Sequence, residues 1–218
     1  SPRGIFGASL AQWYLGDVGV APNGADALAW ADQGQLNLDL TQATASKQPA
    51  IGANGLGGHG YLRFVRADAT QLGVASGAPP QTSDHAIFAV AVFSDPNPGA
   101  YTGLCGIGDL NRSSSIGSNN SGLAWYGGAE LVNPTGVPLV ATTAYRIGKV
   151  VSGANTQGYI NGAVDGSAAS NTYGADRSFV AGAYDSGGTG PISADIYEVV
   201  VVDVAPNAGQ IADLDRYF

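Results

Sequence analysis

The 218-residue chain is poor in the residues that most often carry catalytic or metal chemistry. It contains one cysteine, two histidines and no methionine. The single thiol, Cys105, cannot form an intramolecular disulfide or a cysteine-based zinc site. Its neighbours in "YTGLCGIGDL" are apolar, which predicts a buried structural thiol rather than a reactive one. Two histidines without a shared motif do not indicate a metal site, so no metal or other cofactor is expected.

Positive charge is scarce as well. Nine Lys and Arg against 17 Asp and Glu give a net charge of -8. An acidic surface repels phosphate, so neither nucleic-acid binding nor adsorption to an anionic membrane is expected. No apolar run approaches the roughly 20 residues of a membrane-spanning helix, so membrane insertion is not expected. The first eleven residues lack the apolar core of a signal peptide, and the missing methionine at position 1 predicts a processed or truncated chain.

Glycine and apolar residues are abundant. The chain has 33 Gly and 11 Pro while 44% of its residues are hydrophobic, a mixture typical of short strands joined by tight turns. Turn signals recur about every ten residues, which predicts an all-β fold, an antiparallel sandwich or barrel. The run "HAIFAVAVF" (85–93) is continuously apolar, so it should be a central strand covered on both faces. No linker or repeat divides the chain, which predicts one domain over residues 10–218 after an N-terminal arm or tail at residues 1–9.

The chain ends on its clearest helical pattern. Pro206 stops the last strand, and Asn207 with Gln210 three positions later has the spacing of a capping box. An apolar stripe follows at Ile211, Leu214 and Phe218. A helix this short is not stable alone, so it should lie against the sandwich and seal an edge or an open end of the core.

Three blocks resemble the concanavalin A-like or laminin G-like jelly-roll family, over about residues 10–218. They are "IYEVVVVD" followed by "AGQIADLDRYF", the hairpin-like "VVSGANTQGYINGAVDG", and "WADQGQLNLDLTQATASKQPAIGANG". The last is similar to the opening of lectin-like modules often carried on phage and bacterial surface proteins. The resemblance, together with the turn spacing, implies an all-β, two-sheet antiparallel jelly-roll β-sandwich that binds carbohydrate. The family's acidic segment after the third block appears here as "FVRADATQL", so no calcium ligands are carried over.

Some relatives with this fold are glycoside hydrolases or polysaccharide lyases, but their signatures are missing. The chain has neither alternating Glu, Asp and Glu on one strand nor a Gln-x-His strand. Its glutamates, Glu130 and Glu198, lie far apart in the sequence. Glu198 is expected to pair with an arginine or a backbone amide, and the alternative is one carboxylate of an acid/base pair. His85 should be structural at a strand end, and His59 should be exposed in a glycine loop. We therefore expect a protein that is not an enzyme.

That glycine loop, residues 55–60, matches the spacing G-x-G-x-x-G of dinucleotide-binding proteins. The fingerprint requires a strand before the loop and a helix after it. Here the strand pattern "YLRFV" follows the loop, so no nucleotide site is expected.

The aromatic residues indicate a candidate ligand site. Trp13, Tyr14 and Trp30 lie in apolar strand contexts and are expected in the core. Trp125 and Tyr126 follow a Ser/Asn-rich loop that contains Asn119 and Asn120. Adjacent strand residues face opposite ways, so one of the two rings should point outward. An exposed ring beside amides suits sugar binding, and packing in the core or at a subunit contact is the alternative.

The sequence therefore predicts a non-catalytic lectin-like surface module, displayed on a phage virion as a fibre or capsid decoration, or extracellular. Its partner would be a glycan or a host-surface receptor. Display as a homo-oligomer or in many copies is expected, because single sugar sites bind weakly. The first alternative is a structural decoration protein that contacts capsid or fibre subunits, and the second is a glycan-cleaving enzyme.

Overall fold

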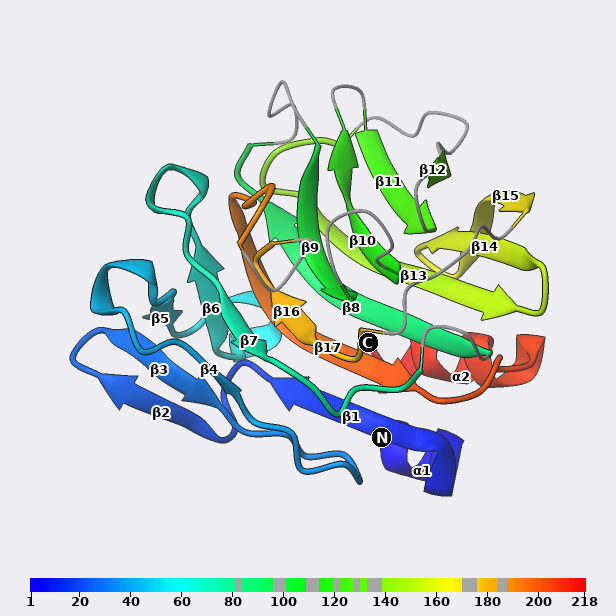
Figure 1. The fold of residues 1–218 in the computed structure, drawn as a ribbon, viewed down its shortest axis with the longest axis horizontal. Coiled ribbons are helices and arrows are strands. Elements are labelled where there is room, and N and C mark those ends of the chain that lie inside the picture. The colour runs from blue at the N-terminus through cyan, green and yellow to red at the C-terminus, as the bar shows by residue number, and fades with distance from the viewer. Residues whose placement is uncertain are drawn as a thin grey trace.

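The computed structural model describes residues 1–80, 84–95, 101–108, 114–119, 122–127, 130–132, 139–169, 176–183 and 188–218. Two antiparallel sheets pack face to face (Figure 1). The β8 sheet contains, in order, β15 (Ala163–Ala169), β14 (Asn155–Ile160), β13 (Ala144–Ser152), β8 (His85–Phe93), β17 (Ala194–Val202) and β1 (Leu10–Leu15). The β9 sheet contains β12 (Glu130–Val132), β11 (Gly122–Gly127), β10 (Ser114–Asn119), β9 (Thr102–Ile107), β16 (Phe179–Ala181), β7 (Leu72–Val74) and β4 (Leu40–Thr41). The predicted all-β sandwich is confirmed.

The two sheets are joined at one end. There β3 (Asp26–Trp30) pairs with β2 (Val20–Asn23), with β4, and with β5 (Ala50–Gly52). In turn β5 pairs with β6 (Tyr61–Phe64), which pairs with the first three residues of β17. One hydrogen-bonded ladder therefore continues from the β9 sheet into the β8 sheet. The 3₁₀ turns are η1 (Gly7–Ser9), η2 (Ala45–Lys47), η3 (Leu56–Gly58) and η4 (Arg66–Asp68).

The main core lies between the sheets. Tyr14 and Trp30 are fully buried there, which confirms their predicted place, and their ring centroids are 5.4 Å apart. Strand β8 has the predicted bounds and is buried on both faces. Ile87 and Ala89 point into the main core, whereas Ala86 and Phe88 belong to a second apolar cluster on the outer face of the β8 sheet. Every other residue of a strand faces the same side, so the continuous apolar run reflects two covered faces.

This second cluster is covered by helices from the two ends of the chain. Helix α2 (Ala208–Tyr217) contributes Ile211 and Leu214. Helix α1 (Pro2–Phe6) contributes Phe6 and lies beside α2 (Figure 1). The segment expected as an arm or tail, residues 1–9, is therefore packed on the body of its own chain. No helix among the described residues is long and apolar enough to cross a membrane.

The capping box that starts α2 is confirmed. The Asn207 side chain accepts a hydrogen bond from the Gln210 backbone N–H, and the Gln210 side chain accepts one from the Asn207 N–H, both at 3.0 Å. The expected position of the helix was wrong, because α2 covers the outer face of the β8 sheet rather than an edge or an open end. The reason is that Val200 and Val202 of β17, with Phe88 of β8, form an apolar surface that needs covering.

Candidate functional site

The structure places the four residues proposed from the sequence as follows. Trp125 in β11 is 0% exposed, and its indole N–H donates a 2.8 Å hydrogen bond to the Gly148 carbonyl. This ring lies in the main core and is closed to a ligand, which corrects the idea that it stacks on a sugar. Asn119 ends β10 and Tyr126 lies in β11, but their side chains fall outside the described structure, as does all of Asn120.

A cavity of about 360 Å³ lies instead on the outer face of the β8 sheet, beside the end of α2. It is formed where β1, β17, the η3 loop and the last residues of the chain meet. Its apolar side chains are Leu15, Leu56 and Val90, its rings are those of Tyr197, Tyr217 and Phe218, and its charged or titratable polar groups are Asp17, His59 and Glu198. Rings, apolar surface and carboxyl groups thus share one hollow.

A β-bulge in β17 brings two of these side chains to the cavity. The pairing with β8 shifts between Ile196 and Glu198, which leaves Tyr197 as the extra residue. Ile196 and Val199 both point into the main core. Because the bulge adds one residue between them, Tyr197 and Glu198 both face outward. An uninterrupted strand would have turned Glu198 into the apolar interior.

Glu198 is held by the Trp13 side chain, with Tyr217 beside it, rather than by the predicted arginine or backbone amide. The Trp13 indole N–H donates to its Oε1 at 2.6 Å, and the Tyr217 hydroxyl is within hydrogen-bonding reach. Glu198 as a whole residue is only 8% exposed. Burial raises the pKa of Glu198 to about 7, with the nearby Asp17 adding to the rise, while the bonds from Trp13 and Tyr217 and the nearby His59 oppose it. Burial and the Glu198 carboxyl together raise the pKa of Tyr217.

An exposed pair stands at the mouth of the cavity. His59 Nδ1 lies 2.9 Å from Asp17 Oδ2, with the two side chains 71% and 39% exposed. The exposure predicted for His59 is confirmed. The loop that carries it is closed by a hydrogen bond from the Gly55 N–H to the His59 carbonyl at 2.8 Å, and it leads into β6 rather than a helix. The match to the dinucleotide fingerprint is therefore coincidental.

Close backbone packing fixes the position of this loop. A Cβ atom on Gly16 would lie 2.5 Å from the carbonyl oxygen of Gly60, closer than real Cβ contacts. A Cβ on Gly55 would similarly meet the Tyr197 ring at 2.5 Å. The glycines are needed here because the loop lies directly on β1 and on the ring that lines the cavity.

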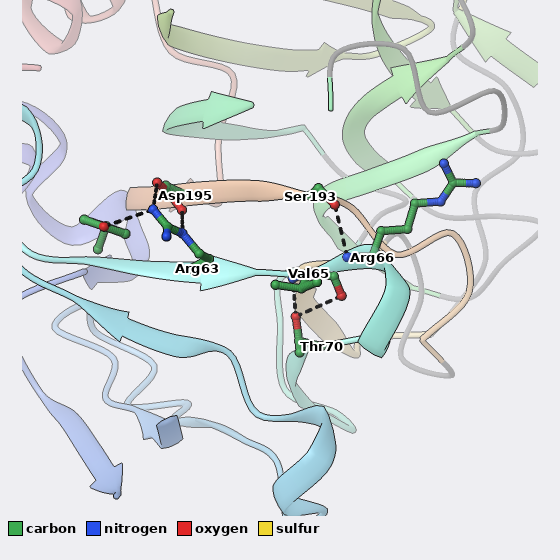
Figure 2. A network of polar contacts seen from close by, with 7 residues as sticks. Arg63, Val65, Arg66, Thr70, Ser193 and Asp195 are labelled. Atoms are coloured by element: carbon green, nitrogen blue, oxygen red, sulfur yellow. Dashed lines mark hydrogen bonds and ion pairs between the residues drawn. The ribbon is translucent and has the colours of Figure 1, made fainter. Parts of the chain in front are cut away.

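The pairing of β6 with β17 forms a seam beside the cavity. A polar network, shown in Figure 2, links these two strands. Arg63 donates to both carboxylate oxygens of Asp195, at 2.7 and 2.9 Å. The Arg63 guanidinium also lies 5.3 Å from the centre of the Tyr61 ring, which contacts the Tyr197 ring at 5.2 Å. Such bidentate pairs fix geometry as well as charge, so Tyr197 lies on a rigid support.

A shallower groove of about 450 Å³ lies next to the cavity and shares Asp17 with it. Gly57 and His59 line the cavity, whereas Gly58 and Gly60 of the same loop line the groove. Ile51 adds an exposed apolar side chain to the groove. The two hollows therefore lie on opposite sides of one loop.

A second polar cluster is enclosed between the sheets. His85 Nε2 lies 2.6 Å from Ser114 Oγ, and the Lys149 ammonium group donates to the same hydroxyl at 2.8 Å. All three residues are fully buried, and burial lowers the pKa of Lys149. The structural, strand-end role predicted for His85 agrees with this position.

Sequence reasoning did not find the Glu198 cavity. Trp13 was assigned to the core, but it is only partly buried and faces outward beside Glu198. The one available signal was a lone glutamate within the valine-rich strand "IYEVVVVD", because an unpaired carboxyl is rare in such a strand. Among the described residues no group of three or more His, Cys, Asp or Glu side chains could hold a metal ion.

No protein-family model matches the chain, and no curated protein matches its sequence. Solved structures share its fold. The binding domain of Paraclostridial Mosquitocidal Protein 1 superposes with a TM-score of 0.71 at 13% identity, over 96% of this chain and 52% of that one. The Botulinum neurotoxin serotype D ligand binding domain in complex with N-acetylneuraminic acid gives 0.70 at 10% identity, over 100% of this chain and 53% of that one.

Trypanosoma rangeli sialidase in complex with sialic acid gives a TM-score of 0.60 at 16% identity, over 97% of this chain and 33% of that one. This chain thus spans between a third and about half of the length of these proteins. At such identities the likeness establishes a shared β-sandwich fold.

Proposed function

We propose that this domain is a non-catalytic carbohydrate-binding module and that the Glu198 cavity is its sugar site. The observation that carries the proposal is the cavity itself, where the rings of Tyr197 and Tyr217 line the same hollow as a buried carboxyl group. Aromatic rings pack on the C–H faces of sugars, and carboxyl and histidine groups pair with hydroxyls. The neurotoxin domain of the same fold that was crystallised with N-acetylneuraminic acid supports this class of ligand.

The adjoining groove suits a ligand longer than one sugar. Because the cavity and the groove share Asp17, a chain of sugars that enters the cavity can continue past the His59 loop. Each hollow is open and shallow enough for weak single-site binding, so display in several copies would supply strength. We therefore propose an oligosaccharide as the ligand.

The setting proposed from the sequence resemblance is retained as a proposal: a concanavalin A-like or laminin G-like jelly roll on a virion or an extracellular surface. A structural decoration role through capsid or fibre subunits is its alternative. Asn119, Asn120 and Tyr126 stay predicted ligand-binding residues, and their side chains lie outside the described residues. Glycan binding by the purified chain distinguishes the two roles, because a structural role through subunit contacts requires none.

A glycan-cleaving enzyme is a second candidate, and one observation favours it. The pKa of Glu198, raised by burial to about 7, is that of a carboxyl group able to donate a proton near neutral pH. Asp17 supplies a second carboxyl group in the same cavity. Against catalysis, Glu198 is held by Trp13 and Tyr217, and Asp17 is engaged by His59.

The test is a glycan array with the wild-type chain, followed by titrations of Tyr217→Ala. Tyr101→Ala is the matched control, because Tyr101 is also exposed but lies outside the cavity. We expect Tyr217→Ala to lose glycan binding without a large drop in melting temperature, while Tyr101→Ala binds as wild type. Equal binding by all three proteins would overturn the site. Shortened oligosaccharide products after incubation would establish the enzyme instead.

A further inference from the structure

We infer that the Glu198 cavity selects a sugar that carries an ammonium group, an amino sugar, over neutral and acidic sugars. The inference rests on the proposed function and names its ligand class. Its first support is the charge of the lining: two carboxyl groups, Asp17 and Glu198, and no lysine or arginine. An acidic sugar would meet like charge in this hollow, with only His59 to offset it.

The nearest arginine of the seam does not change this balance. Arg63 is held by both oxygens of Asp195, so that pair is neutral as a unit. The groups that face Glu198 come from every element packed around it: Trp13 from β1, Asp17 from the turn after β1, His59 from the η3 loop and Tyr217 from α2. None of them is a permanent cation.

The second support is the burial of Glu198. The residue is 8% exposed, yet it lines an open cavity into which a ligand group can reach. Burial disfavours the charged carboxylate, as its raised pKa of about 7 reflects. A cation placed in the cavity compensates for that loss of hydration, and a neutral hydroxyl does so only weakly. Binding of an ammonium group is therefore coupled to ionisation of Glu198.

The third support is the set of rings. Tyr197, Tyr217 and Phe218 line the cavity together with the carboxyl group. The faces of aromatic rings attract ammonium groups, and the attraction grows when water is excluded. Rings combined with a buried carboxyl group form a better environment for a cationic sugar than for a neutral one.

The experiment is isothermal titration calorimetry at pH 6 and about 150 mM salt, where distant surface charges are screened. The probes are a glucosamine trimer, the N-acetylglucosamine trimer and sialyllactose. At pH 6 Glu198 is largely protonated in the free protein, because its pKa is about 7. We expect the glucosamine trimer to bind at least about tenfold more tightly than the other two probes. Titrations in buffers of different ionisation enthalpy should show release of about one proton for this probe alone.

Two variants test whether Glu198 causes the preference for the glucosamine trimer. Glu198→Gln should weaken binding of the glucosamine trimer at least about tenfold and abolish proton release. Asp68→Asn removes a carboxyl group at an exposed position on η4, outside the cavity, and should bind within about twofold of wild type. Circular dichroism and melting curves of both variants confirm that they fold.

The outcomes separate this inference from the proposed function. If both trimers bind equally without proton release, and Tyr217→Ala abolishes both, the sugar site stands and the selection of an amino sugar is overturned. An equal loss in Asp68→Asn and Glu198→Gln would overturn it too, since general attraction to an acidic chain would then explain the binding. If no probe binds and the glycan array is blank, both proposals fail.

Discussion

The indole Nε1 of Trp13 donates a 2.6 Å hydrogen bond to Oε1 of Glu198, a residue 185 positions away in the chain. The two residues are diagonal neighbours across the pairing of β1 with β17, where Leu15 lies opposite Glu198 and Trp13 lies opposite Val200. The bond orients a carboxyl group at the edge of the second apolar cluster, beside the end of α2. The geometry of the cavity therefore depends on the register of these two strands.

The free energy of unfolding should depend on pH through Glu198. Its pKa is about 7 when folded against 4.5 as the unperturbed value, so the native state binds more protons than the unfolded state between these values. The wild type should therefore lose stability as the pH rises from 4.5 to 7, by up to about 3 kcal/mol. Urea unfolding across this range measures the slope, and Glu198→Gln should flatten it and exceed wild-type stability at pH 8. Parallel curves for the two proteins would contradict the assignment, and Asp68→Asn is the control.

Trp125 should matter for stability and not for ligand binding. It is fully buried and its ring lies against Gly158, where an added Cβ would come within 2.6 Å. Trp125→Ala should lower the free energy of unfolding by about 3–5 kcal/mol, as removal of a buried large aromatic does. Trp125→Phe keeps the ring packing but loses the bond to Gly148, at a cost of about 1–2 kcal/mol, and should bind glycan normally. Lost binding with unchanged melting would restore a site at this loop.

Helix α2 should contribute much of the stability of the β8 sheet. Leu214 is 1% exposed within the second apolar cluster, so Leu214→Ala should cost about 2–4 kcal/mol in urea unfolding. Asp213 is its exposed neighbour, and Asp213→Ala should stay within about 0.5 kcal/mol of wild type. A chain that ends at Asp203 should be insoluble or molten, because Val200 and Val202 would lose their cover. Melting of that truncated chain at the wild-type temperature would show that the helix is dispensable.

The Cys105 thiol should be inert in the folded protein. It is fully buried, and burial raises its pKa to about 12, so the reactive thiolate is almost absent near neutral pH. An aromatic disulfide reagent at pH 8 should label the native protein only as fast as it unfolds, and should label it at once in urea. Rapid labelling of the native state, at the rate of a free thiol, would contradict the buried position.

Local patterns predicted two elements of this fold, the strand at 85–93 and the terminal helix. The spacing of Asn207 and Gln210 predicted the capping box, which the hydrogen bonds confirm, because capping depends on residues only three positions apart. The continuous apolar run of 85–93 predicted a strand with both faces covered, and β8 has these bounds. Neither prediction needed knowledge of distant residues.

The same patterns were misleading wherever two distant segments meet. Simple alternation along β17 would place Glu198 on the core face. The bulge at Tyr197 places it on the outer face instead. Trp125 follows a polar loop in the sequence, yet its strand points the ring between the sheets. There the Gly148 carbonyl accepts a hydrogen bond from the indole N–H. A bulge or the burial of a ring depends on the partner strand, which sequence spacing does not identify.

By itself the sequence determined the all-β class, the strand at 85–93, the terminal helix with its cap, and the scarcity of catalytic and cationic residues. These follow from composition and from interactions within one turn or one strand. Only the tertiary structure decided that α2 covers the outer face of the β8 sheet, and that Glu198, held by Trp13, lines one cavity together with Tyr217. The reason is that register and packing are fixed by contacts between segments up to 185 positions apart. These contacts stabilise the fold only when both segments are in place.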